Sequence, residues 1–122
     1  AMGESRWRAD EALLDAVTAV SGSGPAYVFY VMEAMMDAAV RMGLSPDAAR
    51  QLTLGTFQGA SALALASEDP PSVLRERVTS KGGTTFAALE ALRSADLAGT
   101  FATALEAARA RAQQMGIELG QQ

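Results

Sequence analysis

Residues 25–42 form the segment that most restricts how this chain can fold. The segment is apolar along most of its length, and its charged residues, Glu33, Asp37 and Arg41, recur every four positions. On an α-helix this spacing places the three charges on one narrow stripe and leaves about two-thirds of the circumference apolar. Such a helix must be covered on nearly all sides, by the rest of the chain or by a second chain.

Two environments can cover a helix of this kind. A bilayer is one, but 18 residues are marginal for a span, and each charge at its middle costs roughly 2.5–3.5 kcal/mol on insertion scales. Three charges exclude that environment. The other is a protein core, and a chain of 122 residues has few elements with which to wrap a central helix. We therefore expect the core to be shared with a second copy.

Composition supports an all-α fold and excludes several kinds of chemistry. Ala, the best helix former, makes up about a fifth of the chain. The chain has no Cys and no His, so by itself it offers no disulfide, thiol nucleophile, Ser-His-Asp triad or thiolate zinc site. We expect no metal site, because no carboxylate cluster has suitable spacing. A net charge of −4 argues against nucleic acid as a partner.

Apolar spacing and turn residues predict one domain of helices. We expect helices at about 10–20, 25–42 and 46–66, a short helix through residue 78, one from residue 84 or 85, and one at 97–115. Gly43 should end the second helix, Ser45 should cap the third and Asp69 should cap the short one.

The domain is expected to span residues 9–116. Residues 1–8 are expected to be a tag remnant and a disordered lead-in, and residues 117–122 a frayed tail after Gly116. The chain shows no leader peptide and has no Cys, which predicts the cytoplasm.

One loop has the composition of a binding site. We call it the Gly-pair loop, and it consists of Ser80, Lys81, Gly82, Gly83, Thr84 and Thr85. Two adjacent Gly residues let the backbone come close to a ligand, and the N–H groups of the helix that follows attract anions. A carboxylate would suit this loop. A mobile turn with a helix cap is the simpler interpretation of the same residues.

Three other features have simpler interpretations. Residues 21–25 (SGSGP) are better explained by a tight turn between helices than by a dinucleotide motif, which needs a preceding strand and a third Gly. Thr18 is expected to hydrogen-bond back to its own helix. Glu68 lies beside a Pro pair and is most simply a solvated carboxylate.

Two stretches of the chain resemble one known family. Residues 15–28 (DAVTAVSGSGPAYV) resemble the opening of the C-terminal domain of pyrroline-5-carboxylate reductase, and residues 78–85 (VTSKGGTT) are similar to that enzyme's second signature. The resemblance implies an all-α helical bundle that intertwines with a second chain as a homodimer. In many members the dimers assemble further into rings.

The resemblance also implies a reaction and a set of site residues. Family members reduce 1-pyrroline-5-carboxylate to proline with NADPH or NADH, which a separate Rossmann domain binds. The Gly-pair loop would hold the substrate carboxylate, and Thr85 would act near the ring nitrogen as a hydrogen-bond or proton donor. Thr18 and Glu68 match positions near the active site. Lys81 departs from the Pro that is frequent in the family.

This chain shows no Gly-rich strand–turn–helix unit, so we expect a fragment that is inactive alone and holds no cofactor. Two further functions stay open. The chain could be a non-catalytic helical homodimerisation module, or the helical domain of a related imine or hydroxyacid reductase.

Overall fold

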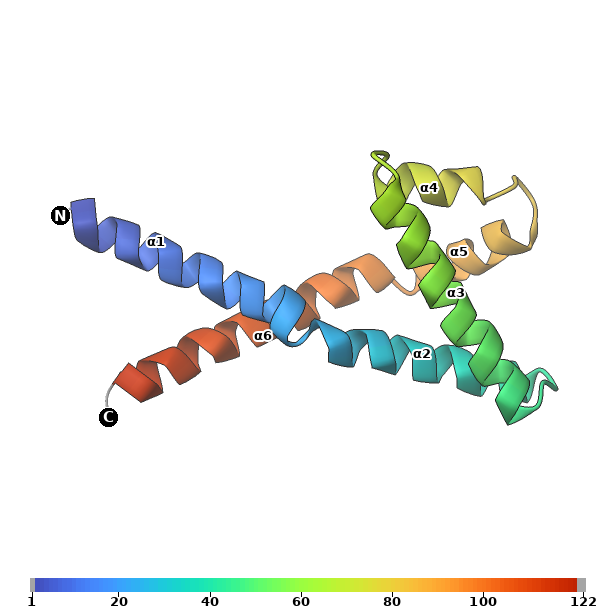
Figure 1. Ribbon diagram of the computed structural model, residues 1–122, viewed down its shortest axis with the longest axis horizontal. Helices are drawn as coiled ribbons and strands as arrows, with labels where there is room; N and C mark the ends of the chain where they lie inside the picture. Colours follow the sequence, from blue (N-terminus) through green and yellow to red (C-terminus); the bar gives the residue numbers. More distant parts are fainter. Residues whose placement is uncertain (1, 121–122) are drawn as a thin grey trace. The chain divides into compact units, whose positions relative to one another are not determined.

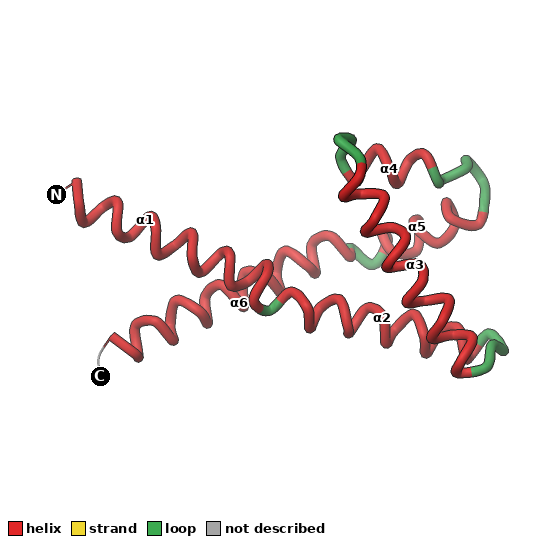
Figure 2. The backbone as a smooth tube through the Cα atoms, viewed as in Figure 1, coloured by secondary structure: helices red, strands yellow, loops and turns green. Residues whose placement is uncertain are grey.

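The computed structural model describes residues 2–120 of the chain. All regular structure in this range is helical, which confirms the all-α prediction (Figures 1 and 2). The elements are α1 (Met2–Val17), the π-helical turn η1 (Thr18–Gly22), α2 (Gly24–Arg41), α3 (Pro46–Ala66), α4 (Pro71–Arg77), α5 (Thr84–Ser94) and α6 (Leu97–Gly120).

Both ends of the chain are more helical than the sequence predicts. The expectation of a disordered lead-in is wrong for residues 2–8, because α1 begins at Met2. The expectation of a frayed tail is wrong for residues 117–120, because α6 passes through Gly116 and ends at Gly120. Residues 1, 121 and 122 lie outside the described range, and the tag origin of the first residues stays a prediction.

Helices α1 and α6 contact each other and also η1. A Gly inside a helix costs about 1 kcal/mol relative to Ala, and packing can outweigh that cost. Leu14 of α1 and Ile117 of α6 line the same groove beyond Gly116. Periodicity in one segment does not reveal that a distant segment packs against it.

The described chain divides into two units. The first unit contains α1, η1, the start of α2, and α6, and its two long helices run in opposite directions (Figure 1). Ala19 in η1 is buried where this turn packs against α1 and α6. The Tyr27 hydroxyl donates a hydrogen bond of 2.8 Å to the carbonyl oxygen of Ala19. This bond satisfies a backbone acceptor at the place where the helical pattern changes.

The second unit, Phe29–Ala95, contains the rest of α2 and helices α3, α4 and α5. Helix α2 ends as predicted at Gly43, whose φ of +106° is a left-handed conformation that Gly adopts easily. The N–H of Leu44 donates to Ala39 O at 3.1 Å, and the N–H of Gly43 donates to Val40 O at 3.0 Å. These two bonds satisfy the last carbonyl groups of the helix.

Helix α3 begins with the cap that the sequence predicts. The Ser45 hydroxyl accepts a hydrogen bond of 3.2 Å from the N–H of Ala48, and Pro46 occupies the first turn. Ala39 of α2 is buried, as are Ala49 and Thr53 of α3. The buried residues of this unit, among those described, are thus small and belong to α2 and α3.

The predicted cap of α4 is wrong. Pro70, not Asp69, is the N-cap residue, and no side chain caps this helix. The Asp69 carboxylate instead pairs with Arg77 at the other end of α4, with 2.7 Å between Oδ2 and Nη2. A full positive charge within reach attracts the carboxylate more strongly than the partial charges of a backbone N–H.

The chain by itself has very little core. Among the residues whose side chains are described, only Ala19, Ala39, Ala49 and Thr53 are buried. The chain exposes 9655 Å², whereas a compact monomer of 12.7 kDa exposes about 6,200 Å² and two compact units of half that mass about 7,500 Å² together. Phe29 of α2 is 66% exposed. This apolar surface has no cover within the described part of the chain.

We expect Ser45→Ala to lower the free energy of unfolding by about 1 kcal/mol, because the N-cap hydrogen bond is lost. Urea unfolding followed by circular dichroism measures the change. Ser61→Ala is the matched control, since Ser61 lies exposed inside the same helix and has no capping role. Equal losses in the two variants would contradict the capping assignment.

Candidate functional site

The Gly-pair loop is a tight turn that leads directly into α5. The N–H of Gly83 donates a hydrogen bond of 2.9 Å to Ser80 O, which closes a four-residue turn. Gly82, the third residue of the turn, has a φ of +77°, whereas φ at Lys81 is not positive. These values match a type II turn, which needs Gly at this position and favours Pro at the position that Lys81 occupies.

Space around the second Gly of the pair is tight. A Cβ atom at position 83 would lie 3.2 Å from Ser80 O and 3.4 Å from Ser80 Cβ. The turn therefore places two Gly residues side by side for two different reasons, one conformational and one steric. The Gly pair was the feature from which the sequence predicted a close approach of the backbone.

The start of α5 offers unused hydrogen-bond donors. Gly83 is its N-cap, and no side chain bonds to the first N–H groups of the helix. Within the described part of the chain, the hydroxyls of Ser80, Thr84 and Thr85 make no hydrogen bond with the protein. Ser80 and Thr84 are exposed, and Thr85 is half-buried.

This arrangement fits a small anion. Backbone N–H groups at a helix start carry partial positive charge, and neighbouring hydroxyls add further donors. The exposed Lys81 side chain supplies a positive charge on the same turn. The Gly-pair loop can therefore hold a carboxylate by several hydrogen bonds.

The other two predicted site residues belong to other segments of the chain. Glu68 is exposed and lies just before α4, whereas the Gly-pair loop follows the other end of α4. Thr18 belongs to the first unit and the loop to the second. The Thr18 hydroxyl donates a hydrogen bond of 3.0 Å to Leu14 O, as predicted for a Thr in a helix.

Residues 21–25 form the end of η1 and the start of α2. No strand precedes them in the described range, so a dinucleotide motif has no support there. The predicted tight turn between helices is wrong in its extent, because only Ser23 lies outside η1 and α2. The Ser21 hydroxyl donates a hydrogen bond of 3.0 Å to Val17 O. The sequence analysis did not predict the π-helical turn or its contact with Tyr27. The one indication in the sequence was the run of Ser and Thr residues, whose hydroxyls can hydrogen-bond back to the helix.

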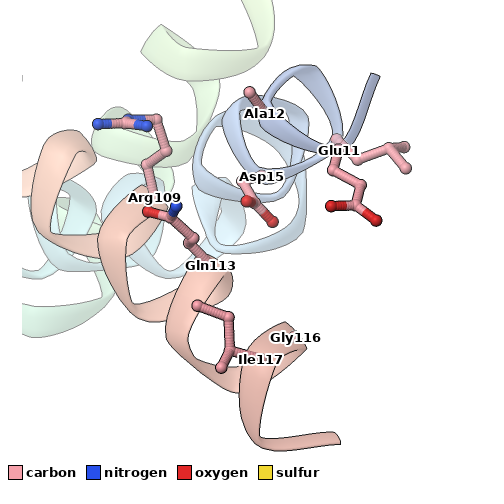
Figure 3. Close-up of a pocket in the computed structure, with 8 residues that line it drawn as sticks. Glu11, Ala12, Asp15, Arg109, Gln113, Gly116 and Ile117 are labelled. Atoms are coloured by element: carbon pink, nitrogen blue, oxygen red, sulfur yellow. The ribbon is translucent and has the colours of Figure 1, made fainter. Parts of the chain in front are cut away.

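A groove between α1 and α6 is a separate hollow of about 550 Å³ (Figure 3). Glu11 and Asp15 of α1 and Arg109 and Gln113 of α6 line it. The Arg109 guanidinium is hydrogen-bonded and ion-paired to Glu106. This bond holds the pKa of the Glu106 carboxyl below its usual value, and the same bond together with the charge of Asp15 raises the pKa of Arg109. Arg109, the one cation among the described residues that line the groove, is thus already paired.

The described residues contain neither a cluster of metal-ligating side chains nor a helix that could span a membrane. No three acidic side chains come together there as a metal ion would need. None of the helices described is long and apolar enough to cross a bilayer.

Comparison with known proteins identifies relatives over almost the whole chain. The family described as pyrroline-5-carboxylate reductase dimerisation matches residues 11–115. Pyrroline-5-carboxylate reductase of Pseudomonas aeruginosa is 49% identical over 121 residues, which are 99% of this chain and 44% of that protein. The enzyme of Pisum sativum is 40% identical over 109 residues, 89% of this chain and 40% of that protein.

Solved structures agree with these sequence matches. Pyrroline carboxylate reductase of Plasmodium falciparum, whose crystal structure has NADP bound, superimposes with a TM-score of 0.83 at 35% identity, over 86% of this chain and 40% of that one. The structure of the Coxiella burnetii enzyme gives a TM-score of 0.82 at 44% identity, over 84% of this chain and 38% of that one. The chain thus spans about two fifths of the length of the relatives it matches.

We expect Gly82→Ala to lower the free energy of unfolding by about 1–2 kcal/mol, because a Cβ atom is unfavourable at positive φ. Lys81→Ala changes the same turn without this penalty and should stay within about 0.5 kcal/mol of the parent. Urea unfolding of both variants tests the turn. A harmless Gly82→Ala substitution would show that the turn is not type II.

Proposed function

Because this chain belongs to the pyrroline-5-carboxylate reductase dimerisation family, we propose that it is the dimerisation and substrate-loop domain of such an enzyme. The proposed reaction is the reduction of 1-pyrroline-5-carboxylate to L-proline with NADPH or NADH. The observation that carries the proposal is the Gly-pair loop, where the start of α5 has no side-chain cap and the neighbouring hydroxyls make no hydrogen bond within the described residues.

The substrate carboxylate would bind at the start of α5. The N–H groups of the first helical turn and the hydroxyls of Ser80 and Thr84 would donate to it, and Lys81 would add a positive charge. Hydrogen bonds to a charged group contribute about 1.5–3 kcal/mol each. Several such bonds hold a small, charged ring in one orientation. Orienting the substrate is the main contribution of a protein to hydride transfer.

Thr85 would serve the nitrogen of the ring. Reduction adds a hydride to the imine carbon and leaves a proton to be delivered to the nitrogen. With no His in the chain, a hydroxyl or water would supply or relay any proton that comes from this domain. Thr85 follows the carboxylate-binding turn and is half-buried, which suits a hydrogen bond to the nitrogen.

A dinucleotide does not fit this chain alone. The cradle for its phosphates is a Gly-rich strand–turn–helix unit, and the described residues contain no strand. The proposal therefore assigns the nicotinamide cofactor to another part of the reductase, and we derive no step from it.

The proposed partner is a second copy of the chain, intertwined with the first. The uncovered apolar residues of α2 and the excess of about 2,100 Å² over two compact units of half the mass support an obligate interface, since such interfaces bury about 2,000–5,000 Å² or more in total. A non-catalytic homodimerisation module would need the same interface but no Gly-pair loop. A related imine or hydroxyacid reductase would need both, and a panel of substrates distinguishes it.

Replacement of the matching region of the Pseudomonas aeruginosa relative by this chain provides the test. We expect the chimera to oxidise NADPH or NADH in the presence of 1-pyrroline-5-carboxylate. Thr85→Val should lower kcat/KM on the order of 10- to 100-fold, because one hydrogen bond to the reacting group is lost. Thr85→Ser keeps the hydroxyl and should retain most of the activity.

Two outcomes of this experiment would contradict the proposal. A chimera that assembles like its parent but lacks activity would favour the non-catalytic module. Full activity in the Thr85→Val variant would remove Thr85 from the site.

A further inference from the structure

The ion pair between Asp69 and Arg77 joins the two ends of α4. Arg77 is the last residue of this helix, and Asp69 lies two positions before its first residue. Nη2 of Arg77 is 2.7 Å from Oδ2 of Asp69. The guanidinium therefore reaches back along a helix that is about 10 Å long, and it ties the end of α4 to the segment that precedes it.

Hydrogen bonds connect this pair to the end of α3. Ser67 is the C-cap residue of α3, and its hydroxyl accepts a hydrogen bond of 3.0 Å from the N–H of Asp69. Both residues are half-buried. The backbone of Asp69 is thereby fixed against α3 while its carboxylate holds the far end of α4.

The series of contacts continues from α4 to the Gly-pair loop. The hydroxyl of Thr79 donates a hydrogen bond of 2.6 Å to Arg75 O. The backbone N–H of Thr79 donates one of 3.1 Å to Glu76 O. The turn of the Gly-pair loop begins at the next residue and ends at the N-cap of α5. The position of the last turn of α4 thus determines where the loop begins.

We propose that Asp69 and Arg77 are positioning residues, whose ion pair holds the Gly-pair loop in the arrangement that binds the substrate carboxylate. The inference rests on the proposed function. Neither residue touches the substrate, and both act through the end of α4. The two side chains are 44% and 60% exposed, so their pair contributes little to global stability. The ion pair instead changes the fraction of molecules in which the Gly-pair loop has its binding conformation. The apparent affinity for the substrate is proportional to this fraction.

Kinetics of the chimera described above test the pair. We expect Asp69→Asn and Arg77→Gln each to raise KM for 1-pyrroline-5-carboxylate about 2- to 5-fold, with kcat changed less than about twofold. The exchanged pair, Asp69→Arg with Arg77→Asp, should return KM toward the parent value. A purely structural role would alter kcat along with KM.

The ion pair between Glu90 and Arg93 on α5 is the matched control. Its atoms are 3.2 Å apart, and its side chains are 54% and 56% exposed. It joins two residues of one helix and does not lead to the Gly-pair loop. Glu90→Gln and Arg93→Gln should therefore leave KM unchanged.

Hydrogen exchange in the 122-residue chain gives a readout that needs no activity. Amide exchange at residues 79–83 should rise about 2- to 5-fold in Asp69→Asn and stay unchanged in Glu90→Gln. Unchanged exchange or an unchanged KM overturns the positioning role. An inactive chimera defeats the proposed function instead, and the exchange rates then decide whether the pair orders the loop.

Discussion

A helix that is apolar on all sides but one cannot remain in water alone, and α2 is such a helix. Within its own chain it is covered only near the turn to α3, where Ala39 is buried. Phe29, farther from that turn, stays 66% exposed. Burying a large apolar side chain stabilises a protein by about 1.5–3 kcal/mol, so the proposed second chain would supply, by covering α2, much of the core that one chain lacks.

The Gly-pair loop is built on a different physical basis. It is shaped by local contacts: the turn closed by Ser80 and Gly83, the bonds of Thr79 to the end of α4, and the pair of Asp69 with Arg77. None of these depends on a large core. A domain whose core is completed by a partner can thus still carry a defined loop, provided that neighbouring residues determine its conformation.

This difference explains what could be predicted from the sequence. The caps at Gly43 and Ser45 and the helix start after Gly83 depend on the chemistry of adjacent residues, and all three are confirmed. The same holds for the bond from Thr18 back to its own helix. The Gly pair also led directly to the turn of the candidate site.

Features that join distant or competing groups could not be predicted. Helix α6 continues beyond Gly116 to Gly120, although Gly is unfavourable inside a helix. The contact of Tyr27 with Ala19 spans eight residues. Asp69 had two possible partners, a helix start and a cation, and periodicity gives no measure of which attracts it more. The roles of the loop residues toward a substrate stay predictions.

The measurement that tests the account most directly is the molar mass of the chain by light scattering after size-exclusion chromatography, over a range of concentrations. The account predicts a dimer, twice the 12.7 kDa of one chain, or a multiple of dimers, that persists on dilution. A folded monomer at every concentration would contradict it, because the apolar surface of α2 would then be stable in water.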